Sequence, residues 1–71
     1  MPATLDLDKL TSAHVLYWYC RVWRSWGVAY HLANGDQVGE AEWYYHKSDA
    51  MAAAERLAAA RRCPIGKLAA V

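Results

Sequence analysis

The side chains that could bind a metal ion in this chain are a few histidines, cysteines and carboxylates on or near predicted strands. His31, Glu40 and Glu42 carry suitable nitrogen and oxygen atoms, but the expected pairing makes His31 and Glu40 diagonal neighbours only. Two cysteines and three scattered histidines also form none of the short spacings typical of zinc sites. We therefore expect no metal site and interpret His31, Glu40 and Glu42 as exposed side chains of a sheet.

The sequence contains no recognisable arrangement of catalytic residues either. Asp8, Ser12 and His14 lie near the start of the chain, without the context that activates a serine nucleophile. The sequence has no glycine-rich phosphate loop, no nucleophile elbow and no carboxylate pair at catalytic spacing. These observations predict a protein that is not an enzyme and that uses no cofactor.

Length and composition predict one folded domain. The 71-residue chain is 56% hydrophobic with a net charge of +1, which excludes intrinsic disorder, and the length fits a single domain, residues 1–71. No apolar run reaches the ~18–20 residues that span a membrane. The N-terminus has no features of a secretory signal, so we expect a cytoplasmic protein. Cys20 and Cys63 are then expected to be reduced.

Aromatic residues are confined to one part of the chain. All four tryptophans and five tyrosines lie between Tyr17 and Tyr45, and an alanine-rich segment follows. Within residues 14–46 we predict three strands, from His14 to about Arg24, from Val28 to Ala33 and from about Gln37 to His46. The pair Asn34-Gly35 predicts a tight turn between the last two strands.

A helix is predicted over residues 48–62, with Ser48 as its N-cap and Pro64 ending it. One face of this helix is a stripe of small and apolar residues at helical spacing that should allow a close approach to the sheet. The stripe consists of Ala50, Ala53, Ala54, Leu57, Ala58 and Ala60, with Met51 at its edge. Residues 1–13 are expected to form an arm or a short helix, and residues 63–71 a short strand or a docked arm. The predicted fold is α+β with two layers: a three-stranded antiparallel meander and one Ala-rich helix packed on one face, in the order β-β-β-α.

The registers of the hairpins decide which side chains face the helix. A two-residue loop at Asn34-Gly35 fixes the second hairpin, and a three-residue loop ending at Gly27 is preferred for the first, because it buries the less polar residues. A two-residue loop at Arg24-Ser25 would exchange the two faces of the first strand. The preferred core face consists of Leu16, Trp18, Cys20, Val22, Val28, Tyr30, Leu32, Gly39, Ala41, Trp43 and Tyr45. The open face then gathers Tyr17, Tyr19, Arg21, Trp23, His31, Glu40, Glu42, Tyr44 and His46.

The run from Trp26 to Ala60 resembles the second half of a double-stranded-RNA-binding domain. It has a strand, a glycine turn, a strand with Gly and Glu, and then Ser48 followed by an Ala-rich helix. The resemblance implies the sheet and helix of that family. The family binds phosphates through lysines at the start of this helix, where the present sequence has Lys47 and then Asp49, so the basic motif is missing and RNA binding is not implied.

In size and layout the chain is also similar to small phage anti-CRISPR inhibitor proteins. Several of these inhibitors pair a β-hairpin carrying a glycine turn with a following helix. The resemblance implies a phage or mobile-element protein that blocks a host defence complex by steric contact.

These observations predict a small non-enzymatic binding protein that contacts a protein partner through an exposed aromatic sheet face. Tyr, Trp and Arg are enriched at binding hot spots. The predicted partner-binding residues are Tyr17, Tyr19, Arg21, Trp23, Glu40, Glu42 and Tyr44. An alternative is a nucleic-acid-binding module, with a polyanion contact at Arg24, Arg61, Arg62 and Lys67. A homodimer, or coverage of the face by the arm or tail, also stays open.

Overall fold

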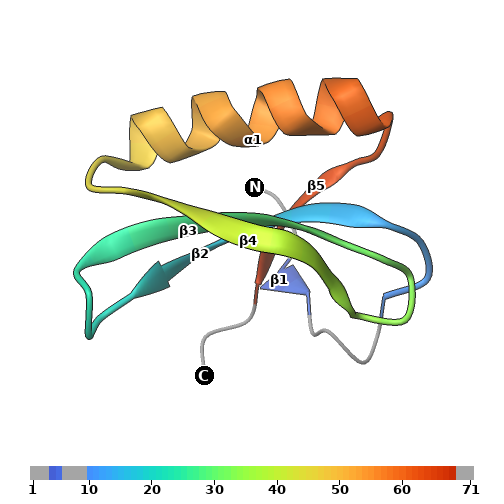
Figure 1. Cartoon of the computed structure of the whole chain (residues 1–71), viewed down its shortest axis with the longest axis horizontal. Helices are drawn as coiled ribbons and strands as arrows, with labels where there is room; N and C mark the ends of the chain where they lie inside the picture. The colour runs from blue at the N-terminus through green and yellow to red at the C-terminus, as the bar shows by residue number, and fades with distance from the viewer. Residues whose placement is uncertain (1–3, 6–9, 69–71) are drawn as a thin grey trace.

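A computed structural model describes residues 4–5 and 10–68 of the chain (Figure 1). Its elements are β1 (Thr4–Leu5), β2 (His14–Cys20), β3 (Ser25–His31), β4 (Gln37–Tyr44), α1 (Lys47–Arg61) and β5 (Ile65–Leu68). The predicted α+β architecture of a sheet with one helix is confirmed. The prediction of an arm or a short helix over residues 1–13 falls mostly on residues outside the described ranges. Of this segment the structure describes residues 4–5, which form β1, and residues 10–13.

The sheet differs from the predicted three-stranded antiparallel meander. Its strand order is β1-β5-β2-β3-β4, and β5 lies parallel to both β1 and β2. Only the β2-β3-β4 part is antiparallel. The helix α1 returns the chain across the sheet after β4, so the next strand starts at the same end as β2 and pairs with it in parallel. Residues 65–68 of the predicted tail therefore form a strand of the sheet, β5, which is one of the two alternatives for this segment.

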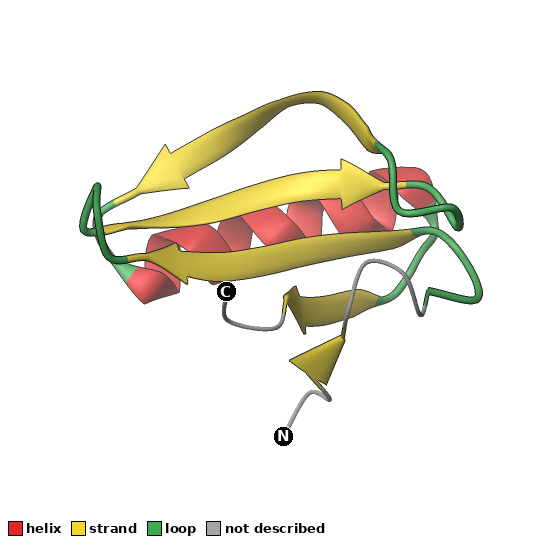
Figure 2. Ribbon diagram, turned by 90° about the horizontal axis from the view of Figure 1, so that it is seen from below, coloured by secondary structure: helices red, strands yellow, loops and turns green. Residues whose placement is uncertain are grey.

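The helix lies on one face of the sheet, mainly across β2 and β3 (Figures 1 and 2). Its buried residues are all alanines, namely Ala50, Ala53, Ala54 and Ala58. The predicted stripe is confirmed at these four positions, whereas Leu57 is half-buried and Ala60 is exposed. The helix begins at Lys47 after an extended His46 that provides no side-chain cap, so the prediction of Ser48 as N-cap was wrong. It ends at Arg61, and Arg62 follows in the left-handed conformation with φ 54°.

The first hairpin has neither of the predicted loops. Cys20 pairs with Ser25 and Tyr17 pairs with Val28, so the loop comprises the four residues from Arg21 to Arg24. Gly27 is a strand residue, and Arg24 is the residue with positive φ, 49°. A change of register by an odd number of residues exchanges the faces of a strand. Odd-numbered residues of β2 therefore face the helix, as in the alternative that exchanged the two faces.

The second hairpin turns at the predicted place but with another geometry. The Leu32 amide donates to the Asp36 carbonyl, and the Gly35 amide to the Leu32 carbonyl, which makes a three-residue loop with Gly35 at φ 92°. The register then shifts between Val28 and Tyr30, beside a bulge in β4 at Gly39, whose φ is 73°. Glu42 and Tyr44, rather than Trp43 and Tyr45, therefore lie on the helix side.

The core follows from these registers. Val15, Tyr17 and Val28 are buried against the helix alanines, with Trp26 and Tyr30 partly buried beside them. The sheet face opposite the helix is also buried along its middle. Leu16 is fully buried there, and Ala29 and His31 are almost fully buried.

His31 was predicted to be exposed, but it is only 4% exposed. Its Nδ1 lies 3.0 Å from the Gly35 carbonyl oxygen and can donate a hydrogen bond to it, so the ring ties β3 to the turn. Among the described residues, no group forms a hydrogen bond with its Nε2 atom.

Candidate functional site

Aromatic side chains cover both faces of the sheet at one end, beside the loop of residues 21–24. On the helix side, a row across three strands pairs Tyr19 with Trp26 and Trp26 with Tyr44. On the opposite side, the neighbouring row pairs Trp18 with Gly27 and Gly27 with Trp43. The alternation of side chains along each strand thus divides consecutive aromatic residues between two surfaces.

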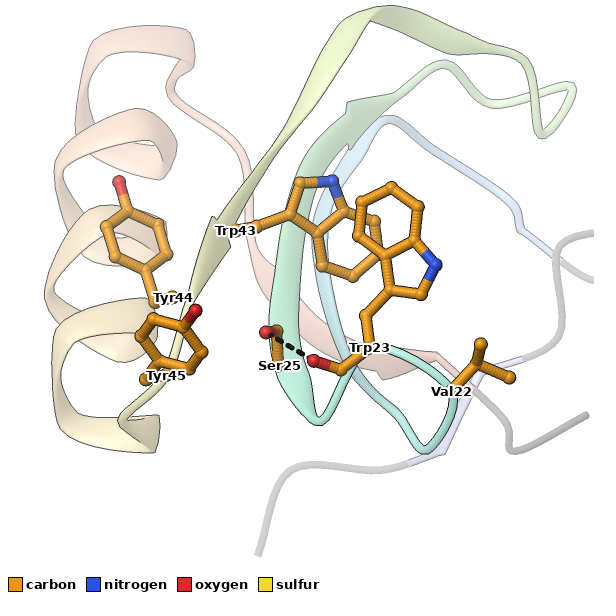
Figure 3. Close-up of a pocket in the computed structure, with 6 residues that line it drawn as sticks. All are labelled: Val22, Trp23, Ser25, Trp43, Tyr44 and Tyr45. Carbon is orange, nitrogen blue, oxygen red and sulfur yellow. Dashed lines mark hydrogen bonds between the residues drawn. The ribbon is translucent and has the colours of Figure 1, made fainter.

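Three tryptophans form a cluster on the side opposite the helix. Trp18 meets Trp43 edge to face, with ring centroids 5.6 Å apart and an interplanar angle of 85°. Trp23, from the loop, lies against Trp43 at 5.3 Å and 34° (Figure 3). Aromatic pairs prefer such tilted and edge-to-face geometries. The loop residue is therefore held against the sheet by a ring on β4.

A second cluster surrounds Trp26 on the helix side. The ring of Tyr19 lies 5.1 Å from Trp26 and that of Tyr17 lies 6.3 Å from it, centroid to centroid. The Lys47 ammonium, in the first turn of α1, sits 5.5 Å from the centre of the Trp26 ring, within the range of a cation–π interaction. This cluster joins the start of the helix to the end of the sheet.

Several of these side chains remain exposed and form a surface that we call the aromatic tip. Trp23 is 65% exposed, and Val22 and Tyr45 are both above 80%. Tyr19 and Trp43 complete the exposed set, at 47% and 39%. A 580 Å³ depression lies at the tip between the loop and the end of β4 (Figure 3). Its lining consists of Val22, Trp23, Ser25, Trp43, Tyr44 and Tyr45.

The loop that carries Trp23 has one stabilising hydrogen bond and one strained residue. The Ser25 hydroxyl, which is buried, donates a 2.9 Å hydrogen bond to the carbonyl of Trp23 (Figure 3). Arg24 adopts a left-handed backbone that costs a non-glycine residue about 1–2 kcal/mol. Strained residues of this kind cluster at ligand-binding sites, and here the strain accompanies an exposed tryptophan between two arginines, Arg21 and Arg24.

The predicted partner-binding residues do not share one open face. Tyr17 is only 3% exposed and belongs to the core, because the hairpin register turns it toward the helix; its prediction as a contact residue was wrong. Tyr44 also packs against the core and is half-buried. Tyr19, Arg21 and Trp23 are exposed at the tip. Glu40 and Glu42 are exposed along β4.

The predicted polyanion residues are spread over the molecule. Arg24 lies in the tip loop, whereas Arg61 and Arg62 lie at the far end of α1 (Figure 1). The Arg61 guanidinium is 4.9 Å from the centre of the Tyr30 ring, a cation–π contact within the fold. Lys67 is exposed on β5. These four residues therefore do not form one continuous basic patch.

Sequence reasoning assigned Val22, Trp43 and Tyr45 to the core, but they are exposed at the tip because both predicted registers differ from the structure. One signal for the tip was present in the sequence. Gly27 follows Trp26 in the aromatic-rich part of the chain, and an isolated glycine within a strand is typical of a position where another group approaches the backbone closely.

The described residues offer little for other kinds of chemistry. No three of their His, Cys, Asp or Glu side chains lie close enough together to hold a metal ion.

Burial raises the pKa of the Cys63 thiol. A hydrogen bond from the Val15 backbone and the charge of Arg61 act in the opposite direction and lower this pKa. Within residues 4–5 and 10–68, no helix has the length and hydropathy to cross a membrane.

Comparison with known proteins gives no match: no protein-family model, no curated protein and no solved structure is significantly similar to this chain. The function must therefore be argued from the site itself.

Proposed function

We propose that this is a small, non-enzymatic binding protein that binds another protein through the aromatic tip. The observation that carries the proposal is the exposure of Val22, Trp23 and Tyr45, next to the half-exposed Trp43, at one end of the molecule. Gathered apolar side chains of this kind cost free energy in water, and on small proteins they mark interaction sites. Trp, Tyr and Arg, the types present at the tip, are also those that dominate binding energy at interfaces.

The way in which the tip is held supports the same function. Trp23 rests on Trp43, and Trp43 rests in turn on Trp18, so the exposed ring is supported by two layers of aromatic contacts. A side chain that is already ordered loses less entropy on binding. The tip therefore presents preorganised anchors to a partner.

An affinity-capture experiment with matched variants tests the proposal. Immobilised wild-type protein should retain partners that Trp23→Ala and Tyr45→Ala fail to retain. Leu32→Ala serves as the control, because Leu32 is also exposed, at 41%, but lies beside the turn at the other end of β3. Retention of the same proteins by all four forms would contradict a role for the tip.

The narrower prediction, that the partner belongs to a host defence complex blocked by a phage or mobile-element inhibitor, is supported by the resemblance in size and layout alone. We include this narrower function in the proposal because the same variants test it. The proteins lost in Trp23→Ala should be subunits of one such complex, and addition of the wild-type protein should inhibit that complex. Loss of unrelated proteins would remove this narrower function while leaving the tip as a binding site.

Nucleic-acid binding is the second candidate function. It is favoured by Arg21 and Arg24 on either side of Trp23, since arginines pair with phosphates while aromatic rings stack on bases. It is opposed by Glu40 and Glu42, which are exposed along β4 and repel a phosphate backbone. Titration with duplex RNA, duplex DNA and single strands at low and physiological salt distinguishes it, because such binding weakens steeply with salt.

A further inference from the structure

The aromatic tip has a charge opposite in sign to that of the rest of the chain. Two segments of the chain carry the exposed side chains of the aromatic tip, residues 18–26 and residues 43–47. They contain Arg21, Arg24 and Lys47 and not one carboxylate, a formal charge of +3 with histidine neutral. Because the whole chain carries +1, the remaining residues together carry −2. These two segments therefore carry a net positive charge where the apolar side chains are exposed, while the other five Lys and Arg residues are outnumbered by the seven carboxylates of the rest of the chain.

We propose that the tip binds an acidic segment of a protein partner, in which carboxylates flank an apolar anchor residue. This inference rests on the proposed function and names the chemistry of the partner. The anchor would pack on Trp23 and Tyr45 beside the depression at the end of β4. The carboxylates would pair with Arg21 and Arg24, which are exposed in the same loop. Such charge complementarity steers association and selects against basic partners.

The extent of the positive surface favours an acidic peptide segment over a nucleic acid. A single strand of nucleic acid is bound along a basic groove that follows several phosphates. Here the cations end at the tip, β4 continues with the exposed Glu42 and Glu40, and Arg61 and Arg62 lie at the far end of the helix. Val22, 87% exposed at the apex of the loop, adds an aliphatic contact that suits a protein side chain.

Selection from a random library of twelve-residue peptides on the immobilised full chain tests this inference. Enriched peptides should carry Asp or Glu on both sides of an apolar or aromatic residue. Their affinity should fall by at least about tenfold in Arg21→Glu with Arg24→Glu, where attraction becomes repulsion, and also in Trp23→Ala. The control Arg56→Glu with Lys67→Glu makes the same change in net charge at exposed positions away from the tip and should leave the affinity within about twofold.

The possible results separate this inference from the proposed function. Enrichment of neutral or basic peptides whose binding depends on Trp23 would overturn the acidic partner and leave the tip as a protein-binding site. If no enriched peptide depends on Trp23, both proposals fail. A twelve-nucleotide thymidine strand is titrated in parallel. Salt-sensitive binding of that strand that depends on Trp23 and Arg24 would replace the acidic peptide with a nucleic acid.

Discussion

Trp18 lies directly opposite Gly27 on the neighbouring strand, and its ring occupies the space that a side chain on Gly27 would need. A Cβ atom added to Gly27 would come within 2.6 Å of two ring carbons of Trp18 and 3.0 Å of Trp43. Glycine is therefore required here for the close approach of a ring to the backbone. The contact fixes the inner layer on which Trp43, and then Trp23, is supported.

Gly27→Ala is expected to destabilise the fold by about 1–3 kcal/mol, the range for overpacking a filled site. Trp18 must move to admit the methyl group, so the near-ultraviolet circular dichroism of the tryptophans should change as well. Urea unfolding measures the first effect, and the spectrum at low denaturant measures the second. An unchanged tryptophan spectrum would contradict the packing of Trp18 over Gly27.

Gly39→Ala provides the matched control for that substitution. A Cβ at Gly39 would meet nothing within 4 Å, but φ there is +73°. The variant should lose about 1–2 kcal/mol through backbone strain alone, with the tryptophan spectrum retained.

Ala54→Leu should destabilise the protein by about 1–3 kcal/mol, because Ala54 is fully buried between α1 and the sheet and a larger side chain would separate the two layers. Ala52 lies on the same helix but is exposed. Ala52→Leu should therefore stay within about 0.5 kcal/mol of wild type. Urea denaturation measures both changes in the free energy of unfolding. Equal effects of the two substitutions would contradict the assignment of Ala54 to the face of α1 that contacts the sheet.

The helix was predictable because its signals are local. The predicted helix agrees with α1 to within one residue at each end, although Ser48, the predicted N-cap, lies inside it. The alanine spacing identified its four buried positions, but it also placed the exposed Ala60 on the same stripe. The position of β5 beside β2 was not predictable from such signals. The short run from Ile65 to Leu68 has no pattern of its own, and its pairing depends on where α1 returns the chain.

The candidate site was only partly predictable, because faces of strands depend on register. The loop from Arg21 to Arg24 contains no Gly, Pro or Asn, whereas Ser25-Trp26-Gly27 looks like a turn and is the start of β3. The observed register of the first hairpin differs from the predicted register by an odd number of residues, so the side chain of Tyr17 points into the core. The residue types thus predicted an exposed aromatic surface, and only the structure could say which of the aromatic residues are exposed.

Arg62→Gly is expected to stabilise the fold by about 0.5–1 kcal/mol. Arg62 has φ 54° and follows the helix, while the Cys63 amide donates to the Ala58 carbonyl at 3.1 Å, an arrangement that favours glycine. Relief of the left-handed strain exceeds the extra entropy of glycine in the unfolded chain. Arg56→Gly, inside the same helix and also exposed, should instead destabilise by about 1 kcal/mol. If urea unfolding shows that both substitutions change the free energy of unfolding in the same direction, the left-handed conformation of Arg62 after the helix would be contradicted.

Alkylation of Cys63 should require a higher pH in the folded protein than in the unfolded chain. Burial disfavours the thiolate and raises the pKa of this thiol, more than the Val15 backbone hydrogen bond and the charge of Arg61 lower it. Because the folded pKa is the higher one, this thiol contributes stability below its unfolded pKa and loses that contribution as pH rises through the folded pKa.

The measurement uses Cys20→Ser, which leaves Cys63 as the single thiol, and follows the alkylation rate against pH with and without urea. The thiolate is the reacting species, so the midpoint of the rate profile reports the pKa directly. The folded profile should lie at higher pH than the profile in urea. Coincident profiles would show that Arg61 and the backbone hydrogen bond balance the effect of burial and would remove the expected loss of stability at alkaline pH. A folded midpoint at lower pH would show that they outweigh burial and would reverse the expected change.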